Sequence, residues 1–236
     1  MIKKIYDKMD KQAITQLPQV TFPGRIVTIL TEGEAGRAVD YLLTHRLLGI
    51  DSETRPAFKR GQRFKVSLLH VSTSDVCFLF RLCRIGLPPC LVRLLENKEV
   101  PLVGLSLNND ILSLHERAKF KPGRLIDLQD VVGEIGIVDQ SLQKIYANIF
   151  GEKISKRQRL SNWDADVLTD RQREYAAIDA WACLRLYEEI GRLKATGEFE
   201  LIHNMPTEGG QLAIARPVHG CGHRNRTEKI WEIIVR

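Results

Sequence analysis

Two carboxylates end an apolar segment in the first quarter of the chain. The segment LLGIDSE, residues 47–53, closes with Asp51 and Glu53. Alternate side chains of a β-strand point to one face, so both carboxylates would project from the same side of a strand end. Like charges at this spacing repel each other, and a bound cation removes the repulsion. The pair therefore raises the question of what stabilises two like charges at the end of a buried strand.

A third acid, Asp110, follows the strand-like segment VGLSL, at the point where a helix is expected to begin. Asn and Asp are common at helix starts because they cap free backbone N–H groups and interact favourably with the helix dipole. Considered alone, Asp110 is better explained by helix capping than by a functional role.

A fourth acid, Asp179, lies four residues after Tyr175 in a long helical segment. This spacing places both side chains on one helix face, about one turn apart. Small residues surround them, which would let the helix approach a sheet closely: Ala176, Ala177 and Ala180. Considered alone, the pair is better explained by a hydrogen bond between a phenol and a carboxylate on a solvated face.

Together the four acids share one geometrical implication. Carboxylates converging on one cleft would repel each other by several kcal/mol unless cations lie among them. Oxygen ligands without a His or Cys cluster favour Mg²⁺ or Mn²⁺ over Zn²⁺. Two such ions about 4 Å apart stabilise the attacking and leaving oxygens of an in-line displacement at phosphorus. The acids therefore predict a two-metal site for phosphoryl chemistry.

Short strand-like segments alternate with longer helix-like segments along the chain, which predicts an α/β fold with a mixed central sheet flanked by helices. The expected strands are 25–30, 47–53, an antiparallel pair at 64–73 and 76–82, and 101–107. The expected helices are 34–45, a segment after Pro89, 109–120, most of 124–136 and 141–151, and a long helix from a capping box at Thr169 to at least Leu193.

Composition limits the class of protein. The 236 residues are 44% hydrophobic, enough for one domain, which we assign to 25–195, with an N-terminal extension at 1–24 and a C-terminal tail of unknown role at 196–236. A net charge of +6 permits a polyanionic partner. Five scattered cysteines, no apolar run of about 20 residues and no secretory signal at the start predict a cytoplasmic protein without membrane association.

Three segments, in this order, resemble the exonuclease motifs of the DEDD superfamily of 3′–5′ exonucleases. They are IDSETRPAF, VGLSLNND and YAAIDAWACLRLY. Tyr175 matches the subtype that carries tyrosine in its third motif, and the segment KISKRQRLSNWDADVLTDRQREYAAIDA is similar to the ribonuclease D and Werner-syndrome exonuclease branch. The resemblance runs from about residue 25 to residue 192.

The resemblance implies a ribonuclease H-like fold and release of nucleoside 5′-monophosphates from a DNA or RNA 3′ end with two divalent cations, Mg²⁺ or Mn²⁺. Asp51 would bridge both ions, Glu53 and Asp179 would complete the site of the attacking water, and Asp110 would support the second ion. Tyr175 would mainly position that water, since a phenol has an ordinary pKa near 10. Asn109 departs from the apolar residue often found before this aspartate.

Basic residues flank the motifs and are candidates for holding a phosphate backbone. One cluster follows the first motif and contains Lys59 and Arg60; the other precedes SNW and consists of Lys153, Lys156, Arg157 and Arg159. We select Lys59, Arg60, Lys156 and Arg157, and we add Ser52, whose backbone would approach the terminal nucleotide. Solvated surface charge explains these clusters about equally well. Trp163 is expected to pack under the long helix and not to stack on a base.

Two rival functions stay open at this stage. A nucleic-acid-binding module without catalysis would gain nothing from repulsive carboxylates at a polyanion site, so the enzyme is favoured. A phosphatase for small phosphate esters would need a closed pocket. The sequence HGCGH, residues 219–223, offers three possible zinc ligands on a Gly-rich tail but no partner motif, and it is a weak zinc candidate.

Overall fold

A six-stranded sheet forms the centre of the molecule, in the order β2-β5-β4-β3-β6-β7. The computed structural model describes residues 2–203. β4 runs antiparallel to both β3 and β5, and the other neighbouring strands are parallel, so the predicted mixed sheet is confirmed. The strands are β2 (Arg25–Ile29), β3 (Leu48–Glu53), β4 (Leu68–Ser72), β5 (Val76–Phe80), β6 (Leu102–Gly104) and β7 (Leu125–Asp127).

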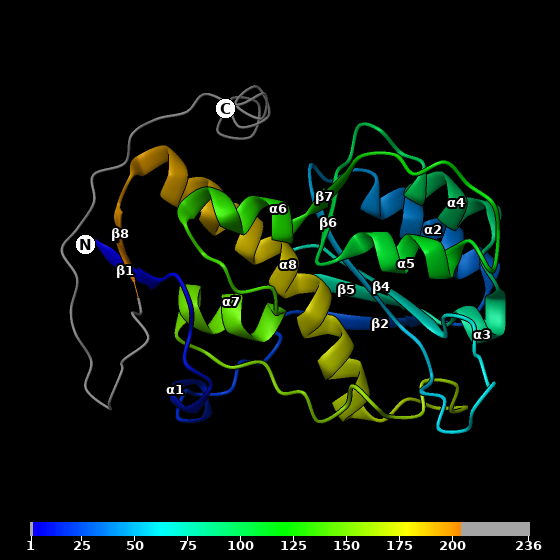
Figure 1. Ribbon diagram of the computed structural model, residues 1–236. Helices are drawn as coiled ribbons and strands as arrows, with labels where there is room; N and C mark the ends of the chain where they lie inside the picture. Colours follow the sequence, from blue (N-terminus) through cyan, green and yellow to red (C-terminus); the bar gives the residue numbers. More distant parts are fainter. Residues whose placement is uncertain (1, 204–236) are drawn as a thin grey trace.

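Helices cover both faces of this sheet, and each face has its own apolar core (Figure 1). One core joins the sheet to α2 (Glu32–Leu42), α4 (Pro89–Leu95) and α5 (Leu107–Leu114). The other joins it to α6 (Leu128–Val132), α7 (Leu142–Phe150) and α8 (Asp170–Thr196). Two short helices, α1 (Lys11–Thr15) and α3 (Leu82–Ile85), and a 3-10 turn at Gly133–Ile135 complete the elements between the strands. None of the described helices is long and apolar enough to cross a bilayer.

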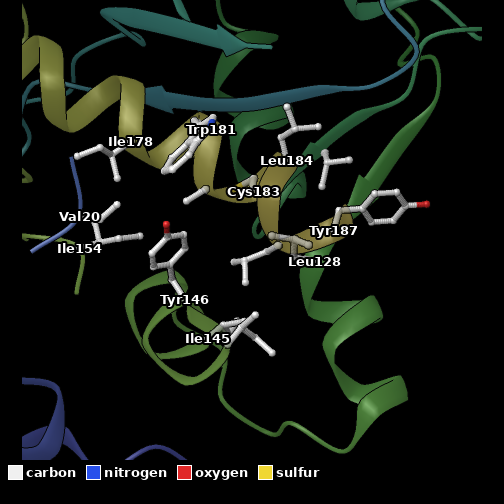
Figure 2. Packing of buried hydrophobic residues seen from close by; sticks show 14 of the residues in the cluster. Val20, Leu128, Ile145, Tyr146, Ile154, Ile178, Trp181, Cys183, Leu184 and Tyr187 are labelled. Carbon is white, nitrogen blue, oxygen red and sulfur yellow. The ribbon is translucent and has the colours of Figure 1, made fainter. Parts of the chain in front are cut away.

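The helix α8 is the main packing element of the second core. It begins at the predicted capping box, in which Thr169 and Gln172 satisfy each other's backbone N–H groups, and it ends at Gly197 in the left-handed conformation. Trp181 and Cys183 of α8 face Tyr146 and Ile145 of α7 (Figure 2). The residues that the sequence predicts to face a sheet, Ala176, Ala177 and Ala180, are buried.

The close approach of α8 to the sheet depends on a glycine in β3. A Cβ atom added to Gly49 would lie 1.9 Å from the carbonyl oxygen of Ala180. Such a distance is far below any van der Waals contact, so only glycine allows the helix backbone to rest on this strand. Residue 49 is two positions before Asp51, and residue 180 is next to Asp179, so this contact brings the two acids into the same region.

Several segments differ from the expected elements, among them the helix predicted at 109–120, which is α5 and ends at Leu114. The segment 124–136 was predicted to be mostly helical, but its first residues form β7, which pairs in parallel with β6. A three-residue strand is too short to show alternation, so the apolar spacing of the helix after it dominated the pattern. The strand predicted at 101–107 ends at Gly104, because Ser106 adopts φ 59° and turns the chain into α5.

A second, two-stranded sheet pairs the two ends of the described chain. β1 (Lys3–Tyr6) runs parallel to β8 (Phe199–Ile202), with Ile5 opposite Leu201. These strands lie in the segments assigned to the N-terminal extension and the C-terminal tail, while the domain boundaries themselves stay predictions. The possible zinc ligands of residues 219–223 lie outside the described residues.

Candidate active site

The four predicted acids come from three neighbouring elements. Asp51 and Glu53 lie at the carboxyl end of β3, and Asp110 lies in the first turn of α5, which follows the neighbouring strand β6. Asp179 lies on α8 where this helix rests on β3. The charges of Asp110, Asp179 and Glu53 all act on the carboxyl group of Asp51, so the fold brings the four acids together.

Burial and mutual repulsion make the charged state of these acids unfavourable. Burial, with the nearby carboxylates next in importance, raises the pKa of Asp51 well above its ordinary value and that of Glu53 to about 9. Burial also raises the pKa of Asp179 to about 7, although the Tyr175 hydroxyl and the Lys156 charge oppose the shift. The pKa of Asp110 is raised by burial to about 6. The site therefore favours protons or cations among these oxygens.

One contact fixes Asp110 itself, and another fixes the start of the helix that carries it. The hydroxyl group of Ser52 donates a hydrogen bond to Asp110 Oδ1, which links β3 to α5. The carboxylate of Asp127 accepts from the backbone N–H groups of Ser106 and Leu107 at 3.0 and 2.8 Å, so it fixes the start of α5. The sequence pointed to neither contact: Asp127 was placed in a helix, and only the backbone of Ser52 was considered.

Tyr175 completes the acidic group. Burial, with the nearby carboxylates of Asp179 and Glu53 next in importance, keeps the pKa of the phenol well above its ordinary value. The ring of Trp163 lies 6.0 Å from the ring of Tyr175, and Trp163 is completely buried. Trp163 thus packs under α8 as the sequence predicted, and it supports the position of the phenol.

A cavity of about 250 Å³ opens beside these residues. Its walls include Asp51, Asp179 and Tyr175 together with the basic residues Lys156 and Arg159. The charge of Arg159 lowers the pKa of Glu53, and that of Lys156 lowers the pKa of Asp179, each against the stronger effect of burial. The cavity therefore combines carboxylates with cationic groups, as a site for a phosphate group and divalent ions requires.

The basic residues selected from the sequence are placed differently from one another. Lys156 lines the cavity of the acids, whereas Arg157 lines a neighbouring cavity. Arg159, which was not among the residues selected from the sequence, also lines the cavity of the acids. Lys59 and Arg60 are exposed in the segment between β3 and β4. The segment 155–161 is neither helix nor strand, so no periodicity in the sequence could show which side each residue faces.

The oxygen atoms of the four acids are suitable ligands for a hard divalent cation. All four acids offer carboxylate oxygens, and a cation would stabilise the charged forms that burial opposes. Within residues 2–203, however, no three His, Cys, Asp or Glu side chains stand together in a geometry ready to hold a metal ion.

Comparison with known proteins gives one family. A family model described as 3′–5′ exonuclease matches residues 26–193. The bifunctional 3′–5′ exonuclease/ATP-dependent helicase WRN of Mus musculus is 30% identical over 210 residues, which are 81% of this chain and 15% of that protein. A 3′–5′ exonuclease of Arabidopsis thaliana is 27% identical over 189 residues, 73% of this chain and 66% of that protein.

Solved structures share the fold. The Aedes aegypti Nibbler EXO domain superposes with a TM-score of 0.66 at 21% identity, over 72% of this chain and 89% of that one. Escherichia coli RNase D, described as an exoribonuclease involved in structured RNA processing, gives a TM-score of 0.62 at 20% identity, over 72% of this chain and 45% of that one. The chain spans only 15% and 26% of the first two curated relatives.

Proposed function

Since the chain belongs to the 3′–5′ exonuclease family, we propose that it releases nucleoside 5′-monophosphates from the 3′ end of a nucleic acid by metal-dependent hydrolysis. The observation that carries the proposal is the convergence of Asp51, Glu53, Asp110 and Asp179 from β3, α5 and α8. The reactive phosphorus is that of the last phosphodiester. Water adds to it, the bond to the 3′ oxygen of the preceding nucleotide breaks, and that oxygen takes up a proton.

Each acid has a place in this proposal. Asp51, Glu53 and Asp179 would hold one divalent ion, Mg²⁺ or Mn²⁺, and Asp51 with Asp110 would hold the second. When bound, the two ions supply the positive charge that acidifies the attacking water and stabilises the leaving oxygen. The hydrogen bond from Ser52 keeps Asp110 oriented toward the site.

The remaining residues of the cavity hold substrate and water. Lys156 and Arg159 face the acids and would bind the oxygens of the scissile phosphate, whose charge they offset. Tyr175 lines the same cavity and would orient the attacking water through the oxygen of its hydroxyl group. Support for a catalytic role over a binding module comes from the convergence of the four acids, since carboxylates beside a polyanion site weaken the binding of a polyanion.

The experiment that tests this function uses DNA and RNA oligonucleotides that carry a label at the 5′ end. With Mn²⁺ or Mg²⁺ we expect stepwise shortening from the 3′ end, and with EDTA no shortening. Asp51→Ala and Asp179→Ala should each abolish shortening while thermal unfolding shows that the fold is retained. Near-normal turnover in either variant, or hydrolysis that persists in EDTA, would refute the assignment.

A further inference from the structure

A second cavity adjoins the cavity of the acids. Its volume is about 200 Å³, and Tyr175 and Ile154 form walls of both cavities. The second cavity has no acid of the catalytic group in its lining. Instead its walls include two arginines, Arg157 from the segment before SNW and Arg171 from the first turn of α8.

Both guanidinium groups are available for a ligand. Arg157 and Arg171 are exposed, and among residues 2–203 neither forms an ion pair. Other arginines of the described chain, such as Arg84 and Arg173, are paired with carboxylates. Arg171 also lies at the helix end where the dipole disfavours a cation, and a bound anion would reverse that effect.

The acid in this cavity is already engaged. Glu174 lines the cavity, and its Oε1 atom accepts a hydrogen bond of 2.7 Å from the backbone N–H of Phe22. The two arginines therefore leave an excess of positive charge next to Tyr175. Guanidinium groups bind phosphate oxygens in a bidentate manner, so a phosphate group suits this cavity better than a neutral ligand does.

We propose that the cavity of Arg157 and Arg171 binds the phosphodiester that lies one nucleotide upstream of the scissile one. This inference rests on the proposed function. The two cavities share the wall formed by Tyr175 and Ile154, so a strand with its last phosphodiester at the acids would reach the second cavity by continuing past that wall. The chain thus recognises a substrate by two consecutive phosphates.

Two short substrates separate this site from the catalytic one. A dinucleoside monophosphate has only the scissile phosphate, and a trinucleoside diphosphate adds the upstream one. In the double variant Arg157→Gln/Arg171→Gln, kcat/KM for the trinucleoside should fall about tenfold or more, since a hydrogen-bonded charge pair is lost. For the dinucleoside it should be unchanged. Arg157→Lys/Arg171→Lys should recover part of the loss.

A matched control and a binding measurement complete the test. Arg46→Gln removes an exposed arginine at the opposite end of β3 and should change neither substrate. In EDTA, the affinity for a labelled single-stranded decamer should fall less steeply with salt in the double variant than in the wild type. The slope of log affinity against log salt concentration should be smaller by about 0.7, which corresponds to one phosphate no longer bound. Equal effects on both short substrates, or no effect on either, would overturn the inference.

The two proposals fail in different ways. If the wild-type protein hydrolyses no substrate, but decamer binding in EDTA depends less steeply on salt in the double variant than in the wild type, the proposed function is wrong and the arginine site stands. If hydrolysis is normal and the salt dependence is unchanged in the double variant, the arginine site is wrong and the proposed function stands. Thermal unfolding of each variant confirms that the fold is retained.

Discussion

The chemistry of a single phenol depends on the residues around it. Tyr175 is half-buried beside carboxylates, and these surroundings raise the pKa of its hydroxyl group. Without a bound cation the phenol is therefore protonated at neutral pH. The hydroxyl oxygen of Tyr175 can accept a hydrogen bond, so orientation of the attacking water is the role that we propose for it.

Replacement of this tyrosine should separate catalysis from metal binding. In Tyr175→Phe we expect turnover to fall about a hundredfold, in the range seen when one positioned hydrogen-bonding group is removed. Affinity for Mn²⁺, measured by calorimetry, should change by less than about a factor of two, because a phenol at this position is not an ion ligand. Unaltered single-turnover rates would remove the phenol from the mechanism.

The acids predict a pH dependence of metal stabilisation. The folded-state pKa values of Asp110, Asp179 and Glu53, about 6, 7 and 9, lie above the ordinary value near 4. Without a cation the folded state therefore binds more protons than the unfolded state, and stability falls as pH rises through this range. A cation displaces those protons, so its stabilising effect grows as pH rises.

The measurement is the increase in Tm caused by Mg²⁺ at pH 5, 6, 7 and 8. If each bound ion displaces one proton, the stabilisation of the folded state by Mg²⁺ grows by about 1.4 kcal/mol per pH unit. For a chain of this size this corresponds to about 3 °C in Tm per pH unit. The difference between samples with and without Mg²⁺ cancels other titrating groups, such as His70, whose pKa burial lowers to about 3. Asp51→Asn should abolish the increase, and an equal increase at pH 5 and pH 8 would contradict the prediction.

At the scale of elements, the contact between α8 and β3 decides whether the site can form. Gly49→Ala would place a Cβ atom against the Ala180 carbonyl and push the helix from the strand. We expect the free energy of unfolding to fall by about 1 to 3 kcal/mol, as for overpacked cores, and turnover to fall because Asp179 moves relative to Asp51. Chemical denaturation and turnover of the folded fraction check both effects.

A glycine on another helix gives the matched control. Gly36 lies within α2, and a Cβ atom there would meet nothing within 4 Å. Gly36→Ala should therefore stabilise the protein by up to about 1 kcal/mol, because alanine has the higher helix propensity. If both substitutions had the same sign, the steric explanation for Gly49 would be wrong.

The sequence predicted those elements that have a long apolar pattern or characteristic residues at fixed positions. The capping box at Thr169, the alanines of α8 and the antiparallel pair of β4 and β5 all follow from local rules, and the structure confirms them. The strand β7 and the caps that Asp127 provides depend on pairing with β6, far away in sequence. Likewise, the side faced by Arg157 or Arg159 is set by tertiary packing alone.

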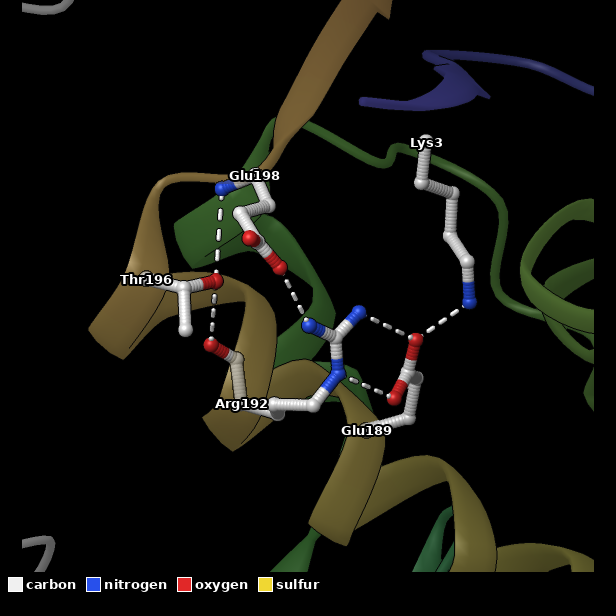
Figure 3. Close-up of polar contacts among 5 residues, drawn as sticks. All are labelled: Lys3, Glu189, Arg192, Thr196 and Glu198. Atoms are coloured by element: carbon white, nitrogen blue, oxygen red, sulfur yellow. Dashed lines mark hydrogen bonds and ion pairs between the residues drawn. The ribbon is translucent and has the colours of Figure 1, made fainter. Parts of the chain in front are cut away.

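At the scale of the whole molecule, the two ends of the described chain stabilise the far end of α8. β1 and β8 pair beside the last turns of this helix, while Tyr175 lies near its first turns (Figure 1). Polar contacts join the same region: Lys3 and Arg192 both bind Glu189, and Arg192 also binds Glu198 (Figure 3). The hydrogen bond from Arg192 and that from Lys3 lower the pKa of Glu189 to about 2.

Burial, and not the ion pairs, should dominate the stability of this region. Ile5 is completely buried in β1 opposite Leu201, so Ile5→Ala should lower the free energy of unfolding by about 2 to 5 kcal/mol through lost burial and a cavity. Lys3→Ala should lower it by less than about 1 kcal/mol, because Arg192 still neutralises Glu189 and the pair is partly solvated.

Hydrogen exchange locates the effect along α8. In Ile5→Ala, backbone amides near Leu193 should exchange faster, because the strands that cover the end of the helix are loosened. Amides near Asp179 should keep their protection, since the contact between Gly49 and Ala180 fixes that part of the helix independently. If Lys3→Ala destabilised the protein as much as Ile5→Ala, the ion pairs would be the main support. Uniform loss of protection along α8 in Ile5→Ala would show that the small sheet and the active site unfold as one unit.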